Sequence, residues 1–172
     1  MAQTYTSRET SINRKKLPAV YGKAELNARN VFDYGCGRYT EHIREHVESL
    51  GKCYFPYDPY NVNPLDNWRS DESVTLLLKN GVAVDVICSN VLNVIDDEEE
   101  IRYITDGISN VVRKGGGTAY FTVYEGDRSG VGRATGEDQY QRNERLKDYL
   151  RFFTSKEVCA KVHNGMIIVR RL

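Results

Sequence analysis

Short apolar runs alternate with amphipathic stretches along most of the chain. Four of these runs have the length and the residue content that are typical of β-strands. They are Asn30–Tyr34, Lys52–Tyr57, Val82–Cys88 and Thr118–Tyr124. The third run is apolar almost throughout, which is typical of a strand that is buried on both faces of a parallel sheet.

The stretches between these runs predict helices. Thr40–Leu50 and Asp97–Arg113 carry apolar residues at helical spacing, and glycine follows both. Gln139–Phe153 also has a helical pattern, whereas Ser70–Lys79 fits either a capped helix or a strand, of which we favour the helix. Strands that alternate with helices in this way indicate a parallel sheet with right-handed crossovers.

The end of the chain predicts a hairpin. Val158–Val162 and Met166–Arg170 flank His163-Asn164-Gly165, and Asn-Gly is a strong signal for a tight turn between antiparallel strands. We therefore expect a single-domain α/β fold over residues 30–172, with a mostly parallel sheet and a C-terminal antiparallel β-hairpin. Residues 1–29 are expected to form a basic N-terminal arm and a helix.

Composition narrows the class of protein. The chain has 172 residues with 24 basic and 24 acidic side chains, which argues against a protein that holds nucleic acid by bulk charge alone. No uncharged apolar run approaches the ~18 residues of a membrane helix, and the polar start lacks the apolar stretch of a signal peptide. The four cysteines are far apart and indicate neither a zinc knuckle nor a disulfide framework. We expect a soluble, cytoplasmic protein with no membrane partner.

Polar residues follow three of the predicted strands. The first strand runs into Asp33-Tyr34-Gly35-Cys36-Gly37, a D-x-G-x-G turn whose glycines allow a ligand to approach the backbone closely. Asp58 stands 25 residues after Asp33, at the end of the second strand, where a carboxylate can hold both hydroxyls of a ribose. Ser89-Asn90 ends the buried strand. Ligands of open α/β sheets bind beyond such strand ends, so the pattern predicts a nucleotide-like ligand.

The nature of that ligand follows from two residues. A nicotinamide fingerprint, G-x-G-x-x-G, needs a third glycine where this chain has Thr40. The carboxylate of Asp33 does not stabilise an anionic pyrophosphate, whereas it does stabilise the ammonium group of an amino acid. S-adenosylmethionine is therefore favoured over a nicotinamide cofactor, and a nicotinamide-dependent oxidoreductase remains the weaker alternative.

Three motifs together resemble class I S-adenosylmethionine-dependent methyltransferases: D-Y-G-C-G-R at 33–38, Y-D-P-Y at 57–60 and S-N-V-L-N-V-I-D-D at 89–97. More narrowly, they are similar to methyltransferases associated with DNA phosphorothioation clusters and to related phage proteins. The similarity extends to T-S-I-N-R-K-K at 10–16 and to G-D-R-S-G-V-G-R at 126–133. It implies a Rossmann-like methyltransferase fold with seven strands, the last antiparallel.

The same resemblance implies where the cofactor binds. The expected contacts are Asp33, Gly35, Gly37, Asp58 and Asn90, and their neighbours Tyr34, Cys36, Pro59 and Val91 complete the predicted site. Tyr39 departs from the pattern, because such loops usually have a third glycine there.

The methyl acceptor is left open between nucleic acid and another phosphate-bearing substrate. The glycine-rich segment 124–138 is long enough to be a lid or a binding loop, and we expect its Arg128 and Arg133 to bind the substrate. Asp58-Pro59-Tyr60 lacks the second proline of the motif found in amino-methylating DNA enzymes, so standard DNA-base methylation is not supported. No general base is assigned. The alternative function is a non-catalytic protein that binds or sequesters S-adenosylmethionine.

Two further motifs suggest metals, and in both a simpler interpretation is favoured. His42-Ile43-Arg44-Glu45-His46 matches an inverted zinc-protease pattern, but its apolar residues already account for a packed helix with a solvated face. The five acids 96–100 stand where a helix N-terminus favours negative charge. No metal site is expected.

Overall fold

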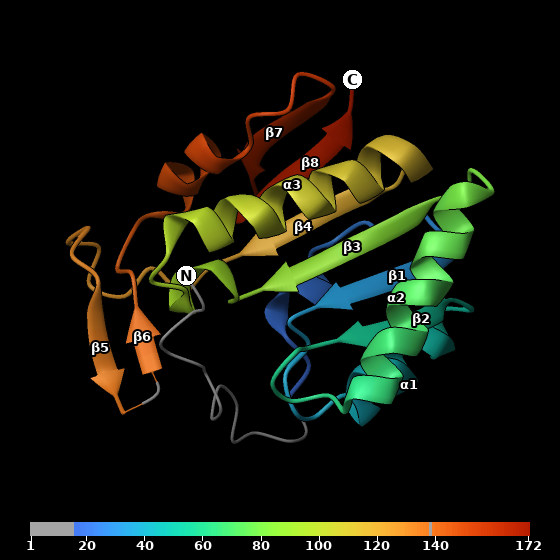
Figure 1. The fold of residues 1–172 in the computed structure, drawn as a ribbon, viewed down its shortest axis with the longest axis horizontal. Helices are drawn as coiled ribbons and strands as arrows, with labels where there is room; N and C mark the ends of the chain where they lie inside the picture. The colour runs from blue at the N-terminus through green and yellow to red at the C-terminus, as the bar shows by residue number, and fades with distance from the viewer. Residues whose placement is uncertain (1–15, 138) are drawn as a thin grey trace.

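A computed structural model describes residues 16–137 and 139–172 of the chain. Its main feature is a six-stranded sheet in the order β2-β1-β3-β4-β8-β7 (Figure 1). The strands are β1 (Asn30–Tyr34), β2 (Cys53–Tyr57), β3 (Val84–Ser89), β4 (Thr118–Thr122), β7 (Val158–His163) and β8 (Met166–Arg171). A separate two-stranded ribbon pairs β5 (Arg133–Gly136) with β6 (Gln139–Gln141).

The connections confirm the prediction of a mostly parallel sheet. The first four strands are parallel, and three helices join them: α1 (Glu41–Ser49), α2 (Pro64–Lys79) and α3 (Glu98–Gly115). The C-terminal hairpin is also confirmed, because β8 lies antiparallel between β4 and β7.

The sheet has six strands in the described part of the chain, one fewer than the resemblance implies. The expected extra strand has no place beyond β2, because α2 leads through residues 80–83 directly into β3. Pro56 fits this arrangement, since a residue without an N–H is tolerated in an edge strand such as β2.

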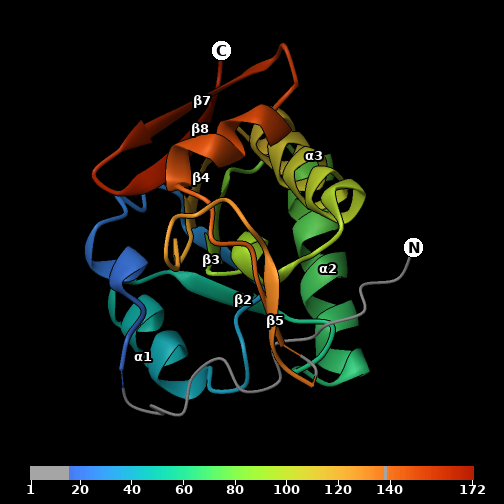
Figure 2. The same ribbon diagram turned by 90° about the vertical axis from the view of Figure 1, so that its left-hand side faces the viewer.

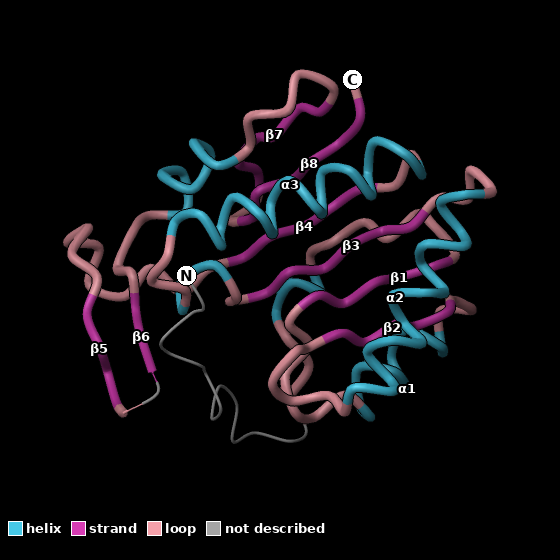
Figure 3. Tube along the Cα trace, in the orientation of Figure 1, coloured by secondary structure: helices cyan, strands magenta, loops and turns pink. Residues whose placement is uncertain are grey.

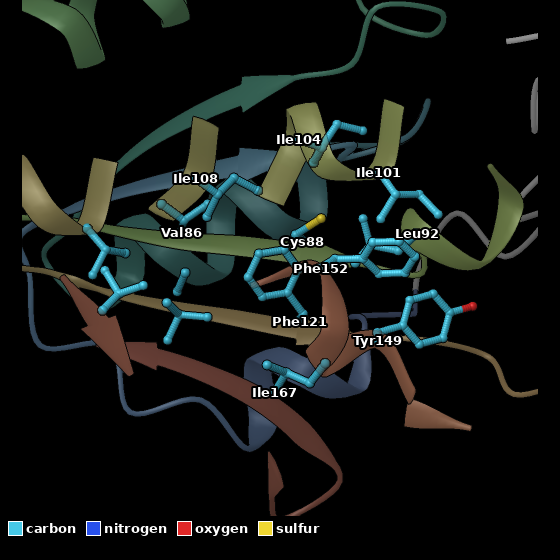
Figure 4. Close-up of a cluster of buried hydrophobic side chains, with 14 of the residues drawn as sticks. Val86, Cys88, Leu92, Ile101, Ile104, Ile108, Phe121, Tyr149, Phe152 and Ile167 are labelled. Atoms are coloured by element: carbon cyan, nitrogen blue, oxygen red, sulfur yellow. The ribbon is translucent and has the colours of Figure 1, made fainter. Parts of the chain in front are cut away.

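Each face of the sheet packs against its own helices (Figure 2). Side chains alternate between the faces along each strand, so Val31 packs on one side and Phe32 on the other. The first face packs against α1 and the 3₁₀ helix η1 (Ala19–Gly22). The second packs against α2, α3 and the 3₁₀ helix η3 (Leu146–Phe152). Figure 4 shows part of that second layer, in which Phe121 and Cys88 of the sheet meet Ile104 and Ile108 of α3.

Helix α3 confirms the expected role of the acidic run at its start. The side chain of Asp97 caps the helix by accepting a hydrogen bond from the amide of Glu99 at 2.9 Å. Glu98 pairs with Arg142 and Arg151, and these basic side chains hold its pKa below the usual value. These acids therefore stabilise the helix and its attachment to η3.

Two predicted helices were wrong in their extent. Helix α2 begins at Pro64 rather than Ser70, because Asn63 provides an N-cap and Pro64 a favourable first residue. Gln139–Phe153 is not one helix: it divides into β6 and η3. Asn143 between them has a left-handed backbone (φ 58°), and the amide of Arg142 donates to the carbonyl of Asn93 instead of continuing a helix.

The N-terminal arm is described only in part. Its basic residues Arg8, Arg14 and Lys15 lie outside the described residues, as does most of the motif at 10–16. Within residues 16–29 the only helix is η1, a single 3₁₀ element. In the described part of the chain no helix is both long enough and apolar enough to cross a membrane.

Candidate functional site

The strand ends of β1, β2 and β3 open onto a cavity of about 490 Å³. The strand order changes direction here: the chain leaves β1 through α1 on one face and leaves β2 through α2 on the other. Figure 3 shows the loops that follow the three strands gathered at this edge of the sheet. Ligands of open α/β sheets bind at such switch points.

All nine residues that were predicted to bind the cofactor line this one cavity. They are Asp33, Tyr34, Gly35, Cys36, Gly37, Asp58, Pro59, Asn90 and Val91. They come from three strand ends that are distant in the sequence, so the fold brings the predicted set together.

The glycine turn lies unusually close to the loop after β3. Gly35 and Gly37 have left-handed backbones, with φ of 75° and 76°. A Cβ atom on Gly35 would overlap Cγ2 of Val91. The amides of Gly35 and Cys36 donate to the carbonyl of Tyr57 at 2.7 and 3.2 Å, which fixes the turn to the end of β2. Only glycine at position 35 satisfies both the backbone angle and the contact.

Asp33 is a buried carboxylate on the wall of the cavity. The hydroxyls of Tyr21 and Tyr54 donate to its Oδ2 at 2.7 and 2.8 Å. Within the described residues no donor reaches Oδ1. Burial raises the pKa of Asp33 from 3.8 to about 6, although the two tyrosine hydrogen bonds act in the opposite direction. A buried carboxylate with a vacant acceptor is suited to bind a cationic group.

Asp58 holds the site together as well as lining it. Its Oδ2 accepts from the amide of Gly37 at 3.0 Å, and its Oδ1 accepts from the amides of Tyr60 and Asn61 and from the side chain of Asn61. Asp58 therefore joins the glycine turn to the end of β2. A carboxylate has about four acceptor sites in total, and Oδ2, which has a single donor, retains capacity for a ligand hydroxyl.

The third strand end is conformationally constrained. Asn90 has a φ of 57°, a region that non-glycine residues seldom adopt, and its amide donates to the carbonyl of Thr122 at 2.8 Å. Ser89 forms a hydrogen bond with the hydroxyl of Thr122 at 2.9 Å, so its side chain is held by β4. Asn90 is exposed on the cavity wall and is the polar side chain that this end offers to a ligand.

Several further residues, beyond the nine predicted cofactor residues, complete the cavity wall. Lys16–Ala19 cover one side, beside His42 of α1, whose Nε2 lies 3.0 Å from the carbonyl oxygen of Lys16. Tyr21 and Tyr54 act through Asp33. No sequence pattern marks Tyr21 and Tyr54 as residues of the site, because only the folded chain brings them to Asp33.

The thiol of Cys36 lines the cavity but is not suited to act as a nucleophile. Burial raises the pKa of Cys36 well above its usual value, which keeps it a thiol rather than a nucleophilic thiolate. Residues 16–137 and 139–172 contain no cluster of three potential metal ligands. The ring of His46, one of the two histidines of the H-x-x-E-H motif, packs edge-on against the ring of Tyr21, with the ring centroids 6.0 Å apart.

A second cavity, of about 530 Å³, lies next to the first and shares Val94 with it. Its other lining residues come from the end of β4, the following loop, the β5–β6 ribbon and Asn143: Tyr124, Gly126, Asp127, Arg133, Thr135, Gln139, Tyr140, Gln141 and Asn143. Of the two arginines predicted to bind substrate, Arg133 lines this cavity. Arg128 does not, because its Nε is paired with Glu125 at 2.6 Å.

Neither a comparison with protein-family models nor one with curated proteins found a match to this chain.

Proposed function

We propose that the first cavity binds S-adenosylmethionine and that the protein is an S-adenosylmethionine-dependent methyltransferase. The observation that carries the proposal is the convergence of all nine predicted cofactor residues on one cavity at the switch point of the sheet. Its volume of about 490 Å³ lies within the range of small-molecule sites. The sheet adds support, since β8, the last strand, is the one that runs antiparallel to β4, as the methyltransferase resemblance implies.

The chemistry of the cavity wall fits the parts of this cofactor. Asp33 Oδ1 would accept a hydrogen bond from the ammonium group of the amino-acid end, and Gly35 would let the backbone approach that end closely. Asp58 Oδ2 would accept a hydrogen bond from a ribose hydroxyl, and Asn90 would contact the region near the sulfonium. The bound cofactor supplies an activated methyl group, so the protein contributes mainly by aligning the acceptor with it.

A cofactor-binding protein without methyl transfer is the second candidate function. The observation in its favour is that neither acid next to the second cavity is a good base. Hydrogen bonds lower the pKa of Glu125 and of Asp127, through the amide of Leu146 and through Ser129 respectively. Transfer of a labelled methyl group from S-adenosylmethionine to nucleic acid, protein or small-molecule pools distinguishes the two functions.

Replacement of Asp58 tests the proposed cofactor contact. Because a hydrogen bond to a charged group contributes about 1.5–3 kcal/mol, Asp58→Ala is expected to lower the affinity for S-adenosylmethionine by roughly 10- to 150-fold in calorimetry. Asn67→Ala is the matched control, since Asn67 exchanges hydrogen bonds with the backbone of Asp58 and leaves the carboxylate in place. If Asp58→Ala and Asn67→Ala lower the affinity of the native protein by the same factor, or if neither lowers it, the Asp58 carboxylate makes no contact of its own with the cofactor.

A further inference from the structure

The second cavity is a built feature rather than a gap under a loose loop. Two close contacts bring the loop after β4 onto the segment after β5: a Cβ on Gly126 would overlap Oδ1 of Asn143, and one on Gly132 would overlap the hydroxyl of Tyr140. The side chain of the fully buried Asn143 donates to the carbonyl of Val131 at 2.9 Å, and the backbone carbonyl of Asn143 accepts from the amide of Gly130 at 2.9 Å.

A chain of hydrogen bonds ties this cavity to the wall of the first. The side chain of Gln141 donates to the carbonyl of Tyr124 at 2.8 Å and accepts from the side chain of Asn93 at 3.2 Å. Asn93 belongs to the 3₁₀ helix η2 (Leu92–Val94), and its neighbour Val94 faces both cavities. A ligand in the second cavity is therefore held next to whatever occupies the first.

The lining of the second cavity has the chemistry of a nucleotide site. Tyr124 and Tyr140 supply aromatic surface, and the side chain of Tyr124 is 64% exposed and available for stacking. Arg133 is exposed and, in the described part of the chain, has no ion-pair partner within 4.0 Å. Gln139 adds a carboxamide that can pair with the edge of a base. A planar base that carries a phosphate can stack on the tyrosines, form hydrogen bonds with the carboxamide of Gln139 and pair its phosphate with Arg133.

The charges of the cavity limit how many phosphates it can hold. Asp127 is ionised beside Arg133, so the described residues of the lining contribute one positive and one negative charge. Arg133 stabilises a single phosphate, whereas the further charges of a triphosphate meet no second cation among residues 16–137 and 139–172 that line the cavity. This balance favours a nucleoside monophosphate unit.

We infer that the second cavity binds a nucleoside monophosphate unit, free or within a single-stranded nucleic acid, with Tyr124 stacking on the base and Arg133 binding the phosphate. Binding of this ligand does not depend on the proposed function; only its role as the methyl acceptor rests on that function. The position of Val94 between the cavities then places the acceptor beside the methyl donor. In a duplex, a base would have to leave its stack to reach the cavity.

Binding of AMP, ATP and fluorescein-labelled eight-nucleotide single strands and duplexes tests this inference, with anisotropy for the strands and calorimetry for the nucleotides. Arg133→Gln and Tyr124→Ala are each expected to weaken binding of the favoured ligand about tenfold. Arg128→Gln is the matched control: the loop before β5 loses one positive charge outside the cavity, and we expect a change below about twofold. Tighter binding of single strands than of AMP identifies the strand as the source, and equal binding identifies the free nucleotide.

The same titrations are repeated with excess S-adenosylhomocysteine, which we expect to leave nucleotide affinity within about twofold. Displacement of the nucleotide by S-adenosylhomocysteine would place the nucleotide in the first cavity and overturn the inference. Absence of nucleotide binding, or equal losses of nucleotide affinity in the Arg133→Gln and Arg128→Gln variants, would also overturn it. Failure of S-adenosylhomocysteine to bind, with nucleotide binding still dependent on Arg133, would refute the proposed methyltransferase and leave the nucleotide site intact. Circular-dichroism melting of each variant confirms that it is folded.

Discussion

Asp33→Asn is expected to lower the affinity for S-adenosylmethionine on the order of a hundredfold without loss of folding stability. The carbonyl of an asparagine can still accept from Tyr21 and Tyr54, but its amide cannot balance the ammonium group of the ligand. Loss of such a charge pair in a partly buried site costs about 3 kcal/mol. Calorimetry gives the affinity, and urea denaturation gives the free energy of unfolding.

The stability of this variant follows from the raised pKa of Asp33. The folded protein holds the proton more tightly than the unfolded chain, because burial raises the pKa from 3.8 to about 6. The ionised carboxylate therefore destabilises the fold above pH 6, by roughly 3 kcal/mol, and this penalty disappears as the pH falls below both values. Since asparagine removes the penalty, Asp33→Asn is expected to be as stable as the native protein at pH 7, or more stable.

Whereas the stability of the native protein falls as the pH rises through 6, its affinity for the cofactor is expected to increase. A bound ammonium group favours the ionised form of Asp33 and lowers its pKa below that of the free protein. Affinity is therefore highest above pH 6 and falls, at the steepest, about tenfold per pH unit below it. The Asp33→Asn protein should lack this dependence between pH 5 and 7.

Asp85→Asn is the control for replacement of a buried carboxylate. Asp85 accepts from the amides of Ala28 and Thr118, both at 2.8 Å, and lies outside both cavities. Its amide variant places a donor against one of these amides, so we expect lower stability with unchanged cofactor affinity in the folded protein. Equal affinities of the native and Asp33→Asn proteins would remove Asp33 from the cofactor site.

Gly35→Ala is expected to abolish measurable cofactor binding, a loss of at least about a hundredfold. The left-handed backbone at position 35 costs an alanine roughly 1–2 kcal/mol, and the new methyl group would overlap Val91. The turn must then move away from the loop after β3, which displaces the wall of the cavity. Calorimetry with S-adenosylhomocysteine measures the loss.

Gly51→Ala separates the two causes. Gly51 has nearly the same backbone angle, with φ of 73°, but a Cβ there meets no atom within 4 Å. This variant is expected to lose stability alone and to bind the cofactor normally. If Gly35→Ala binds as well as Gly51→Ala, close approach of the turn to Val91 has no role in the site.

The parts of the fold with strong local signals were predictable from the sequence. Helix α3 has a continuous apolar face, an acidic start and a glycine at its end, and the C-terminal hairpin has Asn-Gly at its turn. The β5–β6 ribbon was missed because both strands are short and β5 is exposed throughout, so that pairing rather than alternation of apolar residues defines them. The left-handed Asn143 interrupts the helical pattern that follows.

The candidate site was predictable as a set of residues but not as a set of contacts. Strand ends and glycine spacing located Asp33 and Asp58 in one cavity. The sequence could not reveal that Tyr21 and Tyr54 would share one oxygen of Asp33, because three distant segments meet there. It also could not show that Asp58 bonds to the glycine turn, since that contact depends on the register of β1 and β2.

Titration of the native protein with S-adenosylmethionine and S-adenosylhomocysteine, with NADH as a control, is the most direct test of the central claim. We predict that both sulfur compounds bind with micromolar dissociation constants at pH 7.5, with one site per chain, and that NADH does not bind. Absence of binding by both, in protein shown to be folded by circular dichroism, would contradict it.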